Sequence, residues 1–382
     1  MKVPDIIDLL ERIYSRHAEL GMRGCYQFSF IDQPEGAAEF QVNVGDTATV
    51  QPGRAAHADL TIEMRYEHLE GSVVGQVDLP QKLLHAEISA RGRLTMLYQL
   101  GALVESLRSG EAPNPALAEK KSYKLRYPSV PRPCEVRSAA RAPILEIERR
   151  RDVSLDEFHS RYVAQGIPII MEGAASHWPL AQMNLEAARS FLGNLHGYAL
   201  EAGYEDQVFE GSVNVRVAPM ADFADGFGML GVTTEDRATP YMANNPLPTE
   251  FLPLIETPPH FAADAFIPTI LWMGPAGTLT PIHRDATSSL FCQVWGSKAM
   301  LLAAPHYREE LYTWSTTPEG GLETCDVDPD NPDYERFPRL RDVRFSRVEF
   351  NPGDIFYMPQ GWFHHTWSLT PALSISFFLR QG

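Results

Sequence analysis

Residues 1–110 change hydrophobic period several times along the chain. Apolar residues recur at helical spacing within residues 4–20, with charged residues opposite, which predicts an amphipathic helix. Alternation at every second residue then predicts strands at 25–31, 38–44, 58–64 and 88–92. Helical spacing returns in the segments 66–74, 79–87 and 94–107. The pattern predicts a small α+β domain over residues 1–110 with an antiparallel sheet.

Residues 111–140 interrupt this pattern and predict a linker. The segment is rich in proline, alanine and basic residues, including Pro113, Pro115, Pro128, Pro131, Pro133, Lys120, Lys121 and Lys124. Few of these residues could be buried, and proline stiffens an extended chain. The linker would separate the first domain from a second domain at residues 141–382.

Short strands dominate the second domain. A strand at 144–148 precedes Ser154-Leu-Asp-Glu157, which predicts the start of a helix, and a further strand follows at 167–171. The middle segment, 192–262, contains short strands and turns without a clear pattern. From Thr269 onward, apolar segments predict strands at 269–273, 290–294, 299–303, 348–350, 354–357 and 373–379. Many short strands separated by tight turns predict a mainly β domain, a double-sheet jelly roll of the cupin type.

Composition narrows the class of protein. A chain of 382 residues favours two domains, and 44% hydrophobic with 21% charged residues is typical of a globular protein. A net charge of −16 argues against nucleic-acid partners and anionic membrane surfaces. No apolar segment is long enough for a membrane span, and acidic residues near the N-terminus argue against a signal peptide. Four cysteines without a C-x-x-C pair indicate reduced thiols, so we expect a cytoplasmic protein.

The segment Thr280-Pro-Ile-His283-Arg-Asp285 and the later Trp362-Phe-His364-His365 carry the candidate chemistry. A His-x-Asp pair and a second histidine from a later strand would present two imidazoles and one carboxylate to a metal. This donor set suits non-haem Fe(II), because it leaves open positions for other ligands. Neighbouring residues of a strand point to opposite faces, so only one of His364 and His365 can point inward to join this metal site.

Four motifs of the second domain occur in the order found in a known family: Gly274-Pro-Ala-Gly-Thr-Leu-Thr-Pro-Ile-His-Arg-Asp285, Gln293-Val-Trp-Gly-Ser-Lys298, Asp330-Asn-Pro-Asp-Tyr-Glu-Arg-Phe337 and Pro352-Gly-Asp-Ile-Phe-Tyr-Met-Pro with Gly-Trp-Phe-His364. Residues 141–382 thereby resemble JmjC-like, cupin-type dioxygenases, and in particular the bacterial relatives of the asparaginyl hydroxylase of hypoxia-inducible factor. The resemblance implies an oxygenase that uses Fe(II) and 2-oxoglutarate.

The resemblance also implies roles for single residues. It assigns metal ligation to His283, Asp285 and His364, in preference to His365. Lys298 would bind the distal carboxylate of 2-oxoglutarate, and Thr280, Tyr241 and Ser289 would contribute hydroxyl groups to co-substrate binding. One position departs from the family, since Phe378 replaces a late polar residue, and Ser374 or Ser376 could substitute for it. Trp272, Arg284, Gln293 and Trp362 are further candidates for the walls of the site.

Residues 1–110 resemble the sterol-carrier (type 2) lipid-transfer family. The resemblance is carried by the order of elements and by Ala58-Asp-Leu-Thr-Ile together with Ala86-Glu-Ile-Ser-Ala-Arg-Gly-Arg-Leu. It implies an apolar ligand held between sheet and helices. The helix at 94–107 would then form one wall of a lipid tunnel, although a core-facing helix of a small domain has the same apolar stripe.

The leading hypothesis is hydroxylation of an amino-acid side chain in a peptide or protein. One alternative is oxidation of an apolar or carrier-bound small molecule that residues 1–110 present. A second is a non-oxygenase metal cupin, which would have no need of Lys298 and Thr280. A third is a lipid-binding or scaffold protein with a degenerate jelly roll, against which the intact His-Asp-His set argues. A homodimer is compatible with the resemblance.

Overall fold

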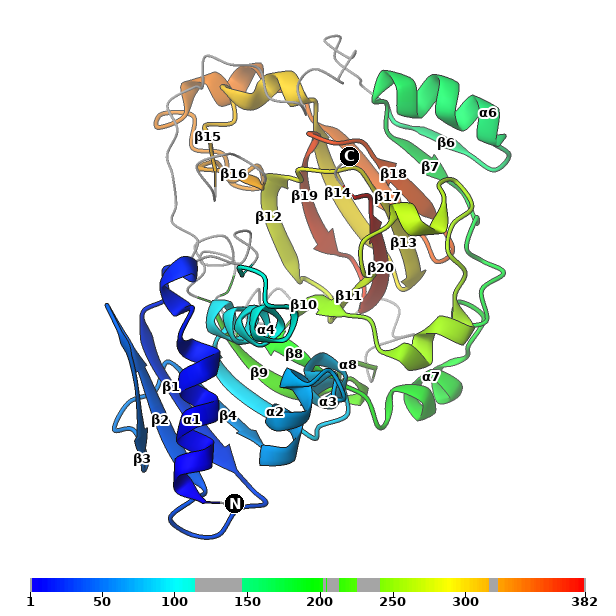
Figure 1. Ribbon diagram of the computed structural model, residues 1–382. Helices are drawn as coiled ribbons and strands as arrows, with labels where there is room; N and C mark the ends of the chain where they lie inside the picture. The colour runs from blue at the N-terminus through cyan, green and yellow to red at the C-terminus, as the bar shows by residue number, and fades with distance from the viewer. Residues whose placement is uncertain are drawn as a thin grey trace. The chain divides into compact units, whose positions relative to one another are not determined.

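The computed structural model describes residues 2–113, 146–201, 204, 213–224, 241–315 and 322–380 (Figure 1). The described chain forms two compact units. Unit 1 contains the residues up to 113 and the segment Leu192–Met220, and unit 2 contains the others. The predicted linker at 111–140 lies outside the described residues, apart from its first three positions.

Unit 1 is built on a seven-stranded sheet in the order β3-β2-β1-β4-β5-β9-β8. Its strands are β1 (Gly24–Phe30), β2 (Glu39–Val44), β3 (Ala48–Pro52), β4 (Leu60–Met64), β5 (Ser89–Arg93), β8 (His196–Leu200) and β9 (Asn214–Pro219). Its helices are α1 (Val3–Tyr14), η1 (His17–Leu20), α2 (Tyr66–Val73), α3 (Leu79–Leu84) and α4 (Leu94–Ser109). Each predicted element of residues 1–110 has a counterpart here, and β3 is an additional strand.

The sheet of unit 1 is mixed, so the prediction of an antiparallel sheet was wrong. β1 and β4 run parallel, with Tyr26 opposite Leu60. The chain forms β2 and β3 on one side of β1 before it returns to the other side as β4. Alternation of apolar residues identifies a strand but carries no information about its direction.

The last two strands of this sheet come from the middle of the sequence. β9 pairs with β5, and β8 pairs with β9, both antiparallel. The hairpin therefore covers an edge that β5 would otherwise expose. This assignment differs from the predicted boundaries, which place all of residues 141–382 in one domain.

Aromatic side chains fill the core of unit 1. Tyr14, Tyr26, Phe28, Phe30 and Phe40 are each at most 1% exposed. Consecutive rings of this set lie 4.9–6.4 Å apart, centroid to centroid. Edge-to-face and offset pairs of this kind stabilise a core beyond the area they bury. The sterol-carrier-like assignment of residues 1–110 stays a prediction.

Unit 2 consists mainly of two sheets. The first has the order β10-β11-β20-β13-β18-β7-β6 and the second the order β15-β16-β12-β19-β14-β17. The strands of the first sheet are β6 (Glu148–Arg150), β7 (Ile169–Met171), β10 (Met242–Pro246), β11 (Ile270–Gly274), β13 (Ser289–Trp295), β18 (Ile355–Met358) and β20 (Ala372–Phe378). The strands of the second are β12 (Leu279–Arg284), β14 (Lys298–Ala303), β15 (Thr313–Ser315), β16 (Glu323–Cys325), β17 (Ser346–Phe350) and β19 (Phe363–Ser368).

The two sheets pack face to face. Met300 and Leu302 of the six-stranded sheet share one buried cluster with Ile170 and Phe356 of the seven-stranded sheet. All described strand pairs of unit 2 are antiparallel, apart from β6 with β7. This arrangement fits the predicted jelly roll. The short helical segments of unit 2 are α6 (Leu155–Glu157), η3 (Phe158–Val163), α7 (Leu185–Leu192), α8 (Ala221–Ala224), η5 (Thr249–Leu254), η6 (Ala263–Ala265), η7 (Pro305–Arg308) and η8 (Pro338–Asp342).

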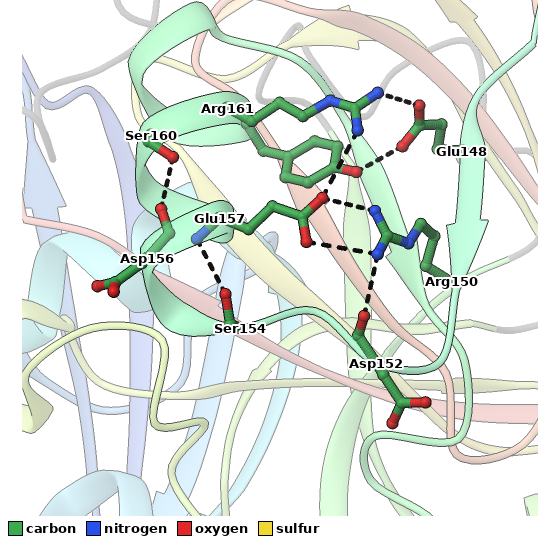
Figure 2. A network of polar contacts seen from close by, with 9 residues as sticks. Glu148, Arg150, Asp152, Ser154, Asp156, Glu157, Ser160 and Arg161 are labelled. Atoms are coloured by element: carbon green, nitrogen blue, oxygen red, sulfur yellow. Dashed lines mark hydrogen bonds and ion pairs between the residues drawn. The ribbon is translucent and has the colours of Figure 1, made fainter.

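A network of polar contacts joins β6 to the first helix of unit 2 (Figure 2). Ser154 accepts a hydrogen bond from the backbone N–H of Glu157 at 3.2 Å, which confirms the predicted helix cap. The Glu157 carboxylate binds Arg150 at 2.6 Å and lies 3.6 Å from Arg161, which also pairs with Glu148. These charges hold the start of the unit against its helix. Among the described residues, no helix is long and apolar enough to cross a membrane.

Candidate metal centre

His283 and His364 lie side by side on the inner face of the six-stranded sheet. β12 and β19 are antiparallel neighbours (Figure 1). The two histidines are directly paired, with ring centroids 4.1 Å apart. His364 is also paired with Leu302, which belongs to the core between the sheets. Paired residues point to the same face, so both imidazoles face the interior of the jelly roll. They are 6% and 7% exposed.

Backbone carbonyl groups orient both rings. The Nδ1 atom of His283 lies 2.8 Å from the Pro281 carbonyl oxygen, and that of His364 lies 3.1 Å from the Trp362 carbonyl oxygen. Since a carbonyl only accepts, each Nδ1 carries the hydrogen and donates it. The lone pair of each neutral ring is then on Nε2, the tautomer that binds a metal through Nε2.

Asp285 completes the group just after the end of β12. Its carboxylate oxygens lie 3.8 Å from His283 Nε2 and 3.6 Å from His364 Nε2. One donor atom from each of the three residues lies within 4.8 Å of the other two, a spacing that could hold a metal ion. Gln360 fixes the following segment, because its side-chain amide donates to the Ala286 carbonyl at 2.6 Å.

The charge state of this group reflects its burial. Burial raises the pKa of Asp285, and it lowers the pKa of His283 well below its usual value, with the neighbouring His364 adding to the effect. Both shifts favour the neutral forms. A divalent cation among these three side chains would balance the negative charge of the buried carboxylate.

Lys298 lies on the same inner face, at the start of β14. It alternates with Met300 and Leu302, it is 2% exposed, and its Nζ atom donates to the Tyr241 hydroxyl at 3.3 Å. Nζ also lies 5.5 Å from the Tyr241 ring centroid and 5.8 Å from that of Phe291. Burial lowers the pKa of Lys298 to about 7. Within the described part of the chain, no carboxylate forms an ion pair with this lysine.

Tyr241 and Thr280 extend this polar group. Burial raises the pKa of Tyr241, while a hydrogen bond with the Thr280 side chain partly opposes the rise. Ser289 begins β13 opposite Phe378 and is 5% exposed. It lies on the same face of its strand as Phe291, which contacts Lys298. The structure thus brings Lys298, Tyr241 and Thr280 together and places Ser289 on the facing sheet.

His365 points the opposite way from His364. It is paired with Leu301, whose neighbours Met300 and Leu302 face the core, and its Nε2 atom lies 3.0 Å from a carboxylate oxygen of Asp330. His365 thus contacts an aspartate on the outer side of the sheet. Of these two adjacent histidines, only His364 belongs to the candidate metal centre with His283 and Asp285.

The serines near Phe378 have partners within their own sheet. Ser374 donates to the Gln293 side chain at 2.9 Å, and Ser376 accepts from the Trp272 indole at 3.0 Å. Gln293 donates in turn to the Trp295 carbonyl at 2.6 Å. These bonds fix a polar row on the inner face of the seven-stranded sheet.

Comparison with known proteins places this site in a family. A family model described as a cupin-like domain matches residues 155–381, more than half of the chain. The chain belongs to the cupin-like domain family. Its curated relatives include Jumonji C domain-containing protein 5 of Drosophila melanogaster, which is 29% identical over 59% of this chain and 57% of that protein. The lysine-specific demethylase JMJ30 of Arabidopsis thaliana is 28% identical over 61% of this chain and 54% of that protein.

A human relative, the bifunctional peptidase and (3S)-lysyl hydroxylase JMJD7, is 26% identical over 58% of this chain and 79% of that protein. The chain spans little more than half the length of the first two relatives. A solved structure, that of E. coli ycfD, aligns with a TM-score of 0.38 and 16% identity over 60% of this chain and 54% of that chain. The fold assignment depends on the family match and the strands above, and not on this likeness.

The cupin-like family of JmjC oxygenases uses Fe(II) and 2-oxoglutarate, so the cofactors predicted from the sequence are confirmed for the family. One residue beside the site did not stand out in the sequence, and one expected residue lies elsewhere. Gln360 is an ordinary residue of a turn, and its bond to the segment after Asp285 becomes visible only in the fold. Arg284, which we expected to line the site, instead points outward and pairs with Glu323 of β16. Alternation along β12 could have excluded it from the inner face.

Proposed function

We propose that this protein is an Fe(II)- and 2-oxoglutarate-dependent hydroxylase that acts on an amino-acid side chain in a peptide or protein. The observation that carries the proposal is the convergence of His283, Asp285 and His364 on one inner face, with both imidazoles oriented to offer Nε2. The family membership and the buried Lys298 support it.

The side chains fit the metal that the family uses. Two imidazole nitrogens and one carboxylate oxygen are the donor set of non-haem Fe(II) oxygenases, and they leave coordination positions open for co-substrate and oxygen. The carbonyl bonds to Nδ1 hold the rings in place without competing for Nε2. His283, Asp285 and His364 would hold the ion.

The group around Lys298 fits a dicarboxylic co-substrate. A buried ammonium without a paired carboxylate is costly, and the distal carboxylate of 2-oxoglutarate would supply the missing negative charge. The hydroxyls of Tyr241 and Thr280 lie in the same group and would bind the same carboxylate. Ser289, on the facing sheet, would provide a further hydroxyl.

With O2 as the oxidant, the bound metal would supply the chemistry that places one oxygen atom in the substrate C–H bond as a hydroxyl group, while the other oxygen atom oxidises 2-oxoglutarate to succinate and CO2. The side chains of this protein would bind and orient the metal and the co-substrate, and they would exclude water from the site. Lys298 would bind one end of the co-substrate, and His283, Asp285 and His364 would hold the metal that binds the other end. The Trp272 ring, 6.3 Å from the Tyr241 ring, and the Phe291 ring limit the entry of water beside Lys298.

The relatives support the proposed substrate class. Their names include a lysyl hydroxylase and a lysine-specific demethylase, and both names refer to side chains of amino acids. Oxidation of an apolar or carrier-bound small molecule presented by residues 1–110, and a metal cupin without oxygenase activity, are the alternatives. The apolar ligand of residues 1–110 and a homodimer stay predictions.

An anaerobic titration of the full chain with Fe(II) and 2-oxoglutarate tests the proposal, followed through the visible charge-transfer band of the chelate. We expect a band that requires both additions, and we expect Asp285→Ala to lose it. Asp264→Ala, which removes an exposed carboxylate of unit 2, serves as the control and should keep the band. A protein that binds iron but gives no band with 2-oxoglutarate would be a cupin of another kind.

A further inference from the structure

Three buried charged side chains lie on the outer face of the six-stranded sheet, and we refer to Arg284, Glu323 and Arg308 as the ionic triad. They are 1%, 1% and 7% exposed. Arg284 Nε donates to Glu323 Oε2 at 2.6 Å. Arg308 donates to the same carboxylate from Nε at 3.1 Å and from Nη2 at 2.8 Å. A single carboxylate thus binds two guanidinium groups away from solvent.

The triad contacts the immediate neighbours of all three candidate ligands. Arg284 is the residue between His283 and Asp285, and its side chain leaves the opposite face of the strand. Its guanidinium carbon lies 4.9 Å from the ring centroid of Phe363, the residue before His364. Arg284 and Phe363 are also directly paired across β12 and β19.

Glu323 connects a third strand, β16, to β12 beside the candidate ligands. It is paired with Arg284 across β12 and β16, and its neighbour Thr324 is paired with His283. The Thr324 hydroxyl donates to the Ile282 carbonyl at 3.0 Å. β16 is therefore held to the ligand strand by charge on its outer side and by a hydroxyl bond at the residue before His283.

Stability alone does not account for these charges. Three ions removed from water carry a large desolvation cost, and apolar residues of similar volume often give an equally stable or more stable protein. The surrounding cluster is already apolar, with Phe363, Leu311 and Ala303 fully buried beside each other. Charged groups differ from apolar ones in forming directional hydrogen bonds. The paired guanidinium and carboxylate groups therefore fix the angle and register of the strands.

We propose that the ionic triad is a positioning device that holds His283, Asp285 and His364 in the arrangement a divalent ion requires. The inference rests on the proposed function, because it takes these three residues as the ligands. Arg284, Glu323 and Arg308 touch neither metal nor substrate. They act through β12, β16 and Phe363, and their effect is on metal affinity and coordination geometry.

Co(II) titration of the metal-free full chain, followed by calorimetry and by the visible spectrum of the bound ion, tests the inference. The main variant is Arg284→Met/Glu323→Leu/Arg308→Met, which replaces all three charged side chains together. We expect the Co(II) dissociation constant to rise about 10- to 100-fold, as for other groups that orient metal ligands. We also expect an altered spectrum and a urea midpoint no lower than that of the wild type.

Arg347→Met is the matched control, because it removes an arginine that lies 5.6 Å from the Trp367 ring centroid, on the same face of the same sheet. It should leave Co(II) affinity and spectrum unchanged. A folded triple variant with wild-type affinity and spectrum would overturn the inference. If the triple variant does not fold, Glu323→Gln is titrated with Co(II) instead. A raised dissociation constant and an altered spectrum are expected, and wild-type values would overturn the inference. Failure of the proposed function has a different signature, in which His364→Ala binds Co(II) as the wild type does.

Discussion

Replacement of Lys298 by methionine should make the folded protein more stable and at the same time remove its affinity for 2-oxoglutarate. The Lys298 side chain is 2% exposed, and burial lowers its pKa from 10.5 to about 7. Methionine has a similar length and no charge, so Lys298→Met removes the desolvation cost with little change in packing. Tyr241 keeps its hydrogen bond with Thr280.

The magnitude follows from the difference between the folded and unfolded pKa values. Between pH 7 and pH 10.5 the unfolded lysine holds a proton that the folded lysine has lost, so stability rises with pH in this window. At about 1.4 kcal/mol for each unit of pKa, the penalty is about 4 kcal/mol at pH 7 and about 2 kcal/mol at pH 9. Loss of the bond to Tyr241 offsets about 1 kcal/mol. The net gain should be about 3 kcal/mol at pH 7.

Urea denaturation of the metal-free protein at pH 7 and pH 9 measures this gain, and calorimetry with 2-oxoglutarate measures the lost affinity. Lys82→Met is the control, since Lys82 forms a partly exposed ion pair with Glu87, and its loss should change the free energy of unfolding by about 0.5 kcal/mol or less. A Lys298→Met variant that is less stable at both pH values would refute the desolvation argument. Retained affinity for 2-oxoglutarate would show that the co-substrate is bound elsewhere.

Three further predictions test other parts of the structure. The affinity for 2-oxoglutarate should be constant below about pH 7 and fall above it, by up to about tenfold per pH unit, because binding requires the protonated Lys298; calorimetry from pH 6 to 9 measures this, and a flat profile would contradict it. His364→Ala should abolish metal binding, whereas His365→Ala should leave it within about threefold and lower stability instead, since His365 binds Asp330; equal losses in Co(II) titration would contradict the inward position of His364. A chain without residues 1–113 leaves β9 without β5, so we expect it to aggregate in size-exclusion chromatography, and a stable monomer would count against the shared sheet.

The sequence could point to a candidate site because its chemistry lies in compact motifs. His283 and Asp285 are two residues apart, and His364 follows a Gly-Trp-Phe segment, so the family resemblance of these motifs implies their roles without knowledge of the fold. The structure then brings the three residues together. The two strands that carry the histidines were less evident. Pro281 interrupts β12 at the point where its register with β19 shifts, and such a bulge is where proline is tolerated in a sheet.

Features that depend on long-range pairing were not predictable from local pattern. The segment 192–262 gives little signal, yet it supplies β8 and β9, which complete the sheet of unit 1. The parallel pairing of β1 and β4 depends on the path of the chain between them, and alternation is blind to that path. The hydrogen-bond partner of Lys298 is also distant in sequence, since Tyr241 is 57 residues away.

Side chains alternate between the two faces of the six-stranded sheet, so adjacent residues have different roles. On β12, His283 faces the interior while Arg284 faces the outer cluster, and on β19 His364 faces inward while Phe363 packs in that outer cluster. The inner residues offer donor atoms, and their neighbours hold the strands that carry them. Substitutions at His283 and Arg284 should therefore differ in kind: a change at His283 removes a ligand at little cost in stability, and a change at Arg284 disturbs affinity through geometry. Because both sets share the same backbone, a change at Arg284 can weaken metal binding while every ligand is still present.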